Sequence, residues 1–361
     1  MHNPTGIMTE PAASDSTPVS RIVSLLPAAT EIVAALGLAD RLVGRSHECD
    51  EPASVTTLPA LTAPRIDPAG TSRQIHDAVG RAIADAPGGS TNALYTLDVE
   101  GLSALKPDLI LTQAACNVCA VATADVHSAV RRMNIPARVL ELSPATLADV
   151  YANILSVGAA TGTLAKAREV VARLRARVAS VACRVQALGD RSSCHVGRPS
   201  RSPTRYVGRP SRSPTRAQRQ ASETLAPRVA CIEWLDPPMA AGNWVPELLG
   251  LAGSRDLLGK PGSHSHWITW DDVIAADPDV VILVPCGFTL DRVVAEAGSP
   301  AIRNRLKMLR AFRTGHIYAV DGHHLFNRPG PRLVDSLEVL ADLLHPGMFA
   351  FPATKRFAKK L

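Results

Sequence analysis

The chain of 361 residues is 46% apolar and 20% charged, which is an ordinary globular composition at a length that accommodates two domains. Its apolar stretches fall short of the roughly 18–20 residues that a membrane-spanning helix needs. The formal charge of +6 comes from one segment, Asp190–Arg219, which holds eight arginines and one acid. The charge therefore gives no reason to expect that the folded body binds nucleic acid.

The first twenty residues, MHNPTGIMTEPAASDSTPVS, contain neither a cationic start nor an apolar run. A secretory signal needs both features, so residues 1–20 are predicted to be a disordered leader. On this basis we expect a cytoplasmic protein. A periplasmic or extracellular location is the alternative if the true start differs from Met1.

Two sequence patterns occur twice in the same order. Arg21–Gly44 and Arg228–Gly259 each predict a strand, a helix and a Gly-containing loop, and they share the similar pieces ALGLADRLVG and LLGLAGSRDLLG. Leu102–Gln113 and Val273–Pro285 each predict a short helix, a Pro-Asp turn and an apolar strand. Apolar strands that alternate with helices predict the α/β class with parallel-type sheets. The duplication predicts two related lobes with a ligand cleft between them.

The segment between the two halves begins with a predicted helix. Residues 163–188 contain no Gly or Pro and are rich in helix formers, so they predict one connecting helix about 40 Å long. The direct repeat HVGRPSRSPTR and YVGRPSRSPTR follows and offers no apolar face to pack. The predicted division is a leader (1–20), an N-terminal lobe (21–162), the connecting helix (163–188), a disordered insertion (189–226), a C-terminal lobe (227–346) and a basic tail (347–361).

The residues that follow each predicted strand are candidates for a site, because ligands bind beyond the carboxyl ends of strands in open parallel sheets. These segments are Ser46–Asp50, Gln113–Cys119, Trp234–Pro237, Pro285–Phe288 and Asp321–Pro329. They contain four of the seven cysteines: Cys49, Cys116, Cys119 and Cys286. Without a secretory signal, we expect reduced thiols rather than a disulfide framework.

The four cysteines leave two interpretations open. Cys116 and Cys119 form a C-x-x-C, which is compatible with a metal, a cluster or redox chemistry, and Cys49 and Cys286 would extend that site. A thiol-ligated metal or redox-active protein is therefore the alternative function. No spacing matches a zinc ribbon, however, and reduced cysteines that shape a pocket are the simpler interpretation.

Histidines, a tryptophan and an arginine carry similar alternatives. His323 and His324 are adjacent, and His264 and His266 flank Ser265. Each pair consists either of metal ligands or of surface loop residues. Trp234 ends a predicted strand beside a Pro-Pro loop, where it would stack on a flat ligand or pack in the core. Arg328 either faces the cleft or caps the helix that follows it. The sequence contains no nucleophile elbow, phosphate-binding loop or dinucleotide fingerprint, so we expect no enzymatic activity.

Several segments together resemble the iron-siderophore/cobalamin type of periplasmic binding protein, the substrate-binding subunits of ABC importers. These are RIVSLLPAATEIVAALGLADRLVGRSHECD, LKPDLIL, the connecting helix and NRPGPRLVDSLEVLADLLHP. The similarity extends over Arg21–Leu188 and Pro227–Pro346. It is greatest for the cobalamin-binding branch, and especially for members with a SHECD-type loop, a C-x-V-C loop and a WVPE segment. Such members commonly have His at the position of Asn243.

The resemblance implies two lobes, a corrinoid or chelated-iron ligand in the cleft, and either import with a permease or a role as a cytosolic carrier. No cofactor is required, a bound metal is optional, and a monomer is expected. The ligand-facing positions that the resemblance implies are Pro27, Ala28, His47, Glu48, Cys49, Gln113, Cys116, Cys119, Trp234, Asn243, Trp244, Cys286, Phe326 and Arg328.

Overall fold

The computed structural model describes residues 18–86, 94–113, 123–189 and 226–361. In the N-terminal lobe it has a parallel sheet with the strand order β2-β1-β5-β6. The strands are β1 (Ile22–Ser24), β2 (Leu42–Arg45), β5 (Leu109–Thr112) and β6 (Arg138–Glu141). β1 and β5 are buried at every residue, which explains why they are almost continuously apolar instead of alternating.

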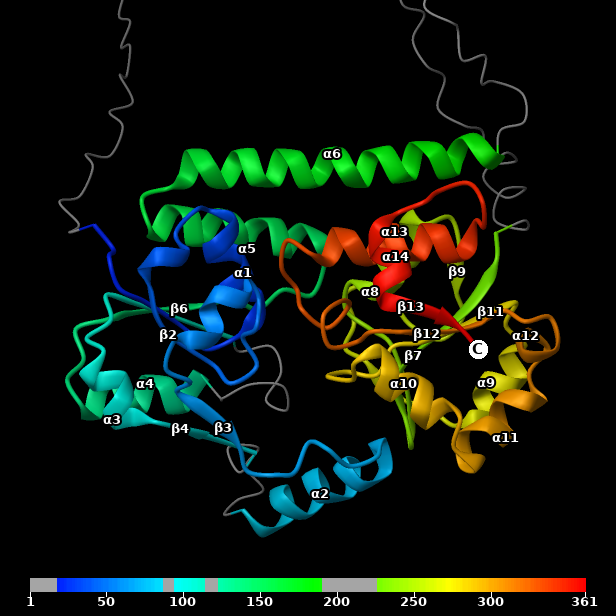
Figure 1. The fold of residues 1–361 in the computed structure, drawn as a ribbon, viewed down its shortest axis with the longest axis horizontal. Helices are drawn as coiled ribbons and strands as arrows, with labels where there is room; N and C mark the ends of the chain where they lie inside the picture. The colour runs from blue at the N-terminus through cyan, green and yellow to red at the C-terminus, as the bar shows by residue number, and fades with distance from the viewer. Residues whose placement is uncertain (1–17, 87–93, 114–122, 190–225) are drawn as a thin grey trace, which may run out of the picture.

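The other elements of this lobe surround that sheet or extend from it (Figure 1). The helices are α1 (Pro27–Ala35), α2 (Ser72–Asp85), α3 (Val99–Ala104), α4 (Thr123–Arg132) and α5 (Leu147–Ala160), with short 3-10 turns at Ala39–Arg41 and Ala53–Thr57. A small antiparallel pair, β3 (Thr62–Pro64) and β4 (Tyr95–Leu97), lies on either side of α2 in the chain.

The C-terminal lobe has a mixed sheet with the order β10-β8-β7-β11-β12-β13. Its strands are β7 (Arg228–Leu235), β8 (Pro238–Ala240), β9 (Arg255–Asp256, paired with β7), β10 (His266–Trp267), β11 (Val280–Leu283), β12 (Ile317–Val320) and β13 (Ala358–Lys360). Its helices are α8 (Val245–Leu251), α9 (Trp270–Ala276), α10 (Leu290–Ala297), α11 (Pro300–Met308), α12 (Arg310–Arg313), α13 (Leu333–Leu344) and α14 (Pro352–Phe357).

The two Pro-Asp units of the duplication lead into β5 and β11, which belong to different sheets. In both sheets this strand pairs in parallel with the first strand of its half, β1 in one lobe and β7 in the other. The predicted fold class, two related α/β lobes joined by one long helix, is confirmed.

The connecting helix α6 (Leu164–Gly189) lies across both lobes (Figure 1). It packs on α5 in the first lobe and on α8 and α13 in the second. Arg177 ties it to α13, with its guanidinium 2.6 Å from Asp335 and 2.7 Å from Glu338. Buried side chains of both lobes and of α6 form one continuous apolar cluster. The helix therefore fixes the lobes together along one side of the molecule.

The chain end belongs to the second sheet. The sequence sets residues 347–361 apart as a basic tail, but α14 packs against α13 and β13 pairs antiparallel with β12. Phe349 and Phe357 are buried between the charged residues and anchor the segment. The leader before residue 18 and the repeat-bearing insertion at 190–225 lie outside the described residues.

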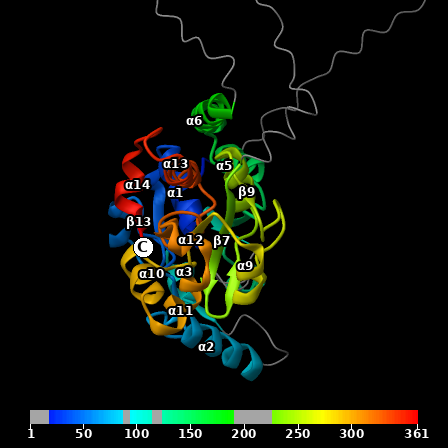
Figure 2. The same ribbon diagram turned by 90° about the vertical axis from the view of Figure 1, so that its right-hand side faces the viewer.

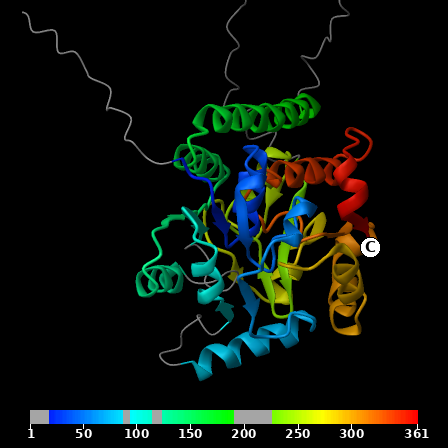
Figure 3. The same cartoon turned by 60° about the vertical axis from the view of Figure 1, so that its left-hand side comes forward.

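The helix α2 lies at the end of the molecule opposite α6 in all three ribbon views (Figures 1, 2 and 3). The sequence assigns it to the N-terminal lobe, yet it contacts β7 of the C-terminal lobe. A capping box formed by Thr71 and Gln74 begins the helix at that contact. Within the described ranges, no helix is both long and apolar enough to cross a bilayer.

Candidate functional site

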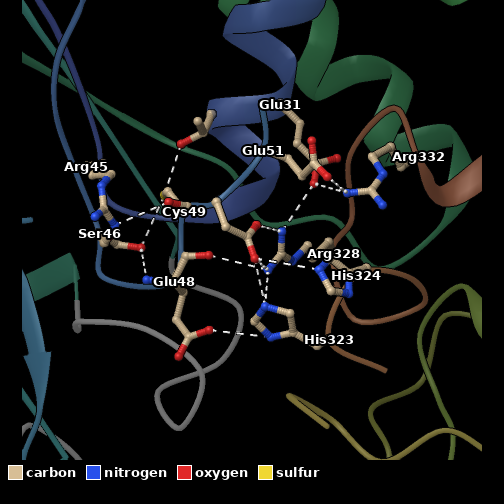
Figure 4. Close-up of polar contacts among 12 residues, drawn as sticks. Glu31, Arg45, Ser46, Glu48, Cys49, Glu51, His323, His324, Arg328 and Arg332 are labelled. Carbon is tan, nitrogen blue, oxygen red and sulfur yellow. Dashed lines mark hydrogen bonds and ion pairs between the residues drawn. The ribbon is translucent and has the colours of Figure 1, made fainter. Parts of the chain in front are cut away.

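Loops from the two lobes meet where their strands end (Figure 4). Asp50 lies in the loop after β2, and Arg328 lies in the loop after β12. The guanidinium of Arg328 donates to both carboxylate oxygens of Asp50, from Nη1 to Oδ1 and from Nη2 to Oδ2 at 3.1 Å. Nη2 also lies 3.3 Å from the carbonyl oxygen of Glu48. Arg328 is only 5% exposed and Asp50 is 31% exposed, so this forked pair joins the lobes with its guanidinium side buried.

Two adjacent histidines complete the contact from the second lobe. His323 Nε2 lies 2.8 Å from Asp50 Oδ2, and its Nδ1 lies 3.7 Å from Glu48 Oε2. His324 Nδ1 lies 3.1 Å from both oxygens of the buried Asp321 carboxylate, and its Nε2 lies 3.9 Å from Asp50 Oδ2. Burial raises the pKa of Asp50, but hydrogen bonds from His323 and Arg328 outweigh it, so the net pKa is well below the usual range.

A buried glutamate of α1 lies behind this contact. Glu31 Oε1 is 3.6 Å from Arg328 and 3.5 Å from Arg332, whereas Oε2 has no hydrogen-bond partner among the described residues. Desolvation raises the pKa of Glu31 to about 7, although both arginines act to lower it. The site therefore contains a carboxyl group that changes charge near neutral pH.

Arg45, at the end of β2, holds the loop that carries Asp50. Its Nη1 donates to the carbonyl oxygens of Ser46 at 3.0 Å, His47 at 3.3 Å and Cys49 at 3.2 Å. The loop thus folds around one guanidinium, and this determines which of its side chains face the other lobe. No pattern in the sequence predicted this role for Arg45.

The same loop turns Cys49 away from the second lobe. Its thiol is 1% exposed beneath α1, where Sγ accepts a 3.0 Å hydrogen bond from Thr30 and lies 3.2 Å from Ser46 Oγ. Burial raises the pKa of the Cys49 thiol. His47 Nδ1 pairs with Thr62 Oγ1 at 2.7 Å, and burial lowers the pKa of His47. Neither side chain takes part in the contact between Asp50 and Arg328.

A second interlobe contact forms around the start of α2. The backbone N–H of Ser72 lies 3.0 Å from the Glu296 carboxylate of α10, and its hydroxyl donates to the same group. Trp234 Nε1 donates to the carbonyl oxygen of Ser72 at 3.2 Å. Arg73 forms an ion pair with Asp236 at the end of β7. The predicted site included Trp234 but not Ser72, Arg73 or Glu296, because α2 and α10 lie far from each other and from Trp234 in sequence.

Several of the sequence-predicted positions lie within the packed interface. Gly330 approaches the backbone of Ala28 so closely that a β-carbon would lie 3.2 Å from its carbonyl oxygen, which covers the turn at Pro27. Trp244 donates to the carbonyl oxygen of Phe326 at 2.6 Å, and both side chains are buried in the core. These two aromatic residues support the loop that carries Arg328.

The remaining predicted positions are distributed around the interface. Asn243 has a left-handed backbone (φ 53°) and exchanges hydrogen bonds with the Gly262–Ser263 turn. Cys286 is half-buried after β11, with its N–H bonded to the carbonyl oxygen of Glu233. Gln113 is half-buried at the end of β5. Cys116 and Cys119 lie outside the described residues.

Among the described residues, one group has the ligand types and spacing of a metal site: Asp50, His323 and His324. It contains neither Cys49 nor Cys286. From the sequence, the two histidines were predicted to follow a strand of the second lobe and to be either metal ligands or surface loop residues. Only the fold shows that Asp50 of the first lobe lies opposite them.

Two α/β lobes that face each other across strand-end loops, fixed by one long helix, define a bilobal binding protein. The family model described as periplasmic binding protein matches residues 22–212, more than half of the chain. The chain therefore belongs to the periplasmic binding protein family. A search of the curated proteins gives no match.

Solved structures with the same fold support this assignment. A periplasmic heme-binding protein from Pseudomonas aeruginosa is 20% identical, with a TM-score of 0.61 and coverage of 91% of this chain and 94% of the other. The periplasmic vitamin B12-binding protein of Vibrio cholerae is 18% identical, with a TM-score of 0.59 and coverage of 91% and 97%. A protein of an Fe3+-hydroxamate transport system from Saccharomonospora viridis is 21% identical, with a TM-score of 0.56 and coverage of 91% and 94%.

These comparisons correct one expectation. The prediction of a cytoplasmic location is wrong, because the family and its structural neighbours are periplasmic solute-binding proteins. That prediction depended only on the composition of residues 1–20, which takes no account of the folded body. The family also does not favour the alternative of a thiol-ligated metal or redox protein.

Proposed function

We propose that this chain is the substrate-binding component of an ABC importer and that it binds a metal chelate of the corrinoid, heme or ferric-siderophore kind between its lobes. The observation that carries the proposal is the meeting of strand-end loops from both lobes around Asp50 and Arg328. Ligands of open α/β sheets bind at such ends. Binding between two lobes, followed by delivery to a permease, requires no bond to be made or broken.

The fold is compatible with a small opening motion rather than a wide hinge. Because α6 packs on helices of both lobes and Arg177 ties it to α13, the lobes can separate most easily at the opposite end, near α2. The contacts there are the hydrogen bonds of Ser72, the ion pair of half-exposed Arg73 with Asp236, and side-chain packing of Ile75 and His76 on the C-terminal lobe. A large ligand would enter where these contacts break.

Within this class, a corrinoid is the ligand that we propose. Trp234 lies at the interface with its ring edge-to-face on Phe288, the two centroids 5.4 Å apart, so it offers an apolar surface beside the end of β7. Arg328 and the two histidines supply polar groups on the same side of the lobe. A vitamin B12-binding protein and heme-binding proteins are among the structures with this fold.

A titration of the purified chain tests the proposal. The ligands are cobalamin, hemin and a ferric hydroxamate, and binding is measured by tryptophan fluorescence quenching and by calorimetry. Cobalamin should bind most tightly. Trp234→Ala should weaken it about five- to a hundredfold, since burial of an aromatic face contributes about 1–3 kcal/mol. Phe312→Ala, which removes a partly buried ring on the far side of the same lobe, is the matched control and should bind normally. Failure of all three chelates to bind would refute the proposal.

A further inference from the structure

The two histidines at the interlobe contact are oriented alike. Each ring has Nδ1 directed at a carboxylate, that of Glu48 for His323 and that of Asp321 for His324. Each has Nε2 directed at the same oxygen, Asp50 Oδ2, at 2.8 Å and 3.9 Å. Metal-ligating histidines commonly donate one ring N–H to a carboxylate while the other nitrogen binds the ion.

The hydrogen bonds of His324 determine which of its nitrogens carries the proton. The Asp321 carboxylate also accepts backbone N–H groups from Leu290 at 3.1 Å and from His324 at 2.7 Å, so it acts as an acceptor. Nδ1 of His324 must then be the donor in the 3.1 Å contacts, and Nε2 of the neutral ring carries a lone pair. That lone pair faces Asp50 Oδ2 across 3.9 Å, which is too long for a hydrogen bond.

His324 Nε2 and Asp50 Oδ2 thus both present lone pairs to the space between them, where a cation would bind favourably. All three ligand atoms of Asp50, His323 and His324 lie within 4.8 Å of one another, which is a separation that one ion could span with small side-chain rotations. We propose that a divalent first-row transition metal ion binds Asp50, His323 and His324 and thereby bridges the two lobes. Two imidazoles and one carboxylate suit ions of the zinc, cobalt, nickel and ferrous type better than calcium or magnesium.

Arg328 borders this site and must shift when the ion binds. Its Nη1 bonds Oδ1 of Asp50, whereas Nη2 donates to Oδ2 at 3.1 Å and lies 3.0 Å from His323 Nε2. Binding of the ion would move Nη2 off these two atoms, and the pair of Nη1 with Oδ1 can stay in place. A hydrogen-bonded carboxylate is the usual ligand state. Neutral His323 would bind the ion through the Nε2 lone pair with its one ring proton on Nδ1, on the side of Glu48. Three protein ligands leave a coordination position for water or for a donor group of a bound ligand.

The charge around the site also favours a dication. The acids in and around the cluster are Glu31, Glu48, Asp50, Glu51 and Asp321, and the cations are Arg45, Arg328 and Arg332. With both histidines neutral, the acids outnumber the cations even when Glu31 is protonated. The inference goes beyond the proposed function, because it concerns a bare ion rather than a chelate.

Calorimetric titration of the chelator-treated full chain with Zn2+, together with visible absorption after Co2+ addition, tests the site. The wild type should bind one ion per chain. Asp50→Asn and His324→Ala should each abolish binding or weaken it at least about a hundredfold. Asp321→Asn, which removes only a supporting carboxylate, should weaken it about 10- to 100-fold. Circular dichroism of the metal-free variants confirms that they are folded.

Two controls address other ligands in the chain. His316→Ala removes a histidine that bonds Thr314 away from the interface, and Cys116→Ser/Cys119→Ser removes the C-x-x-C pair. Both should leave Zn2+ affinity and the Co2+ spectrum unchanged. Zn2+ should also raise the melting temperature of the wild type but not of Asp50→Asn, because that variant lacks the ligand from the first lobe. The proposal is overturned if Zn2+ does not bind, if binding survives in both Asp50→Asn and His324→Ala, or if only the cysteine variant loses it.

Discussion

The indole N–H of Trp234, in β7 of the C-terminal lobe, donates a 3.2 Å hydrogen bond to the carbonyl oxygen of Ser72, at the first residue of α2. Ser72 belongs by sequence to the other half of the chain. The ring that the sequence marks as a platform for a flat ligand is therefore engaged by the opposite lobe in this conformation. If a ligand takes this surface, α2 must first move away from it.

The first prediction concerns the anchor of α2. Glu296→Ala should lower the free energy of unfolding by about 1–3 kcal/mol, because the buried N–H and hydroxyl of Ser72 lose their shared acceptor. Urea denaturation measures the loss. Glu100→Ala, at an exposed position of α3, is the control and should change stability little. Equal effects of the two variants would mean that the carboxylate does not hold α2.

The second prediction is a pH dependence that arises from Glu31. Its pKa is raised from 4.5 to about 7 in the folded protein, so the folded state binds more protons than the unfolded state between these pH values. The free energy of unfolding should therefore fall as pH rises through this window, by at most on the order of 3 kcal/mol. Glu31→Gln cannot ionise and should lose this part of the dependence.

Denaturation curves of the wild type and Glu31→Gln at pH 5 and pH 8 measure this difference. The variant should gain stability relative to the wild type on going from pH 5 to pH 8. Glu169→Gln, whose side chain is 66% exposed on α6, should follow the wild type. Parallel pH profiles for Glu31→Gln and the wild type would exclude Glu31 as the source.

The third prediction separates the geometry of Arg328 from its charge. Arg328→Lys keeps a positive charge but loses the fork that contacts both oxygens of Asp50. We expect it to destabilise the protein by about 1–3 kcal/mol, because charge-assisted hydrogen bonds are lost at a buried position. Arg313→Lys, on the exposed end of α12, should be neutral. A neutral Arg328→Lys would show that charge alone suffices.

The fourth prediction concerns thiol reactivity. Cys183 is exposed on α6, whereas Cys49 and Cys231 are buried and burial raises the pKa of both thiols. Alkylation followed by peptide mass spectrometry should label Cys183 rapidly, and Cys49 and Cys231 only on unfolding, since the thiolate is the reactive form. Rapid labelling of Cys49 in the folded protein would contradict its position beneath α1.

The sequence by itself determined the two lobes, because each of their helices and strands is encoded by a short stretch of residues. Continuously apolar β-branched strands, Pro-Asp turns and a stretch without Gly or Pro each specify an element through short-range rules, and their repetition specified the two halves. The site could be predicted in part for the same reason. Asp50, His323, His324 and Arg328 all lie in loops that follow predicted strands, so the topological rule indicated these loops, although only Arg328 was among the positions expected to face the ligand.

Only the tertiary structure decided which side chains meet. The pairing of Asp50 with Arg328 joins residues 278 positions apart, and that of Ser72 with Glu296 joins residues 224 apart, which no local pattern encodes. Burial also removed two residues from the set that was predicted to face the ligand. Cys49 faces the core because Arg45 shapes its loop, and Phe326 packs inward with its backbone held by Trp244. Side-chain direction in loops depends on contacts from the rest of the fold, and this is why residue type and position alone could not assign it.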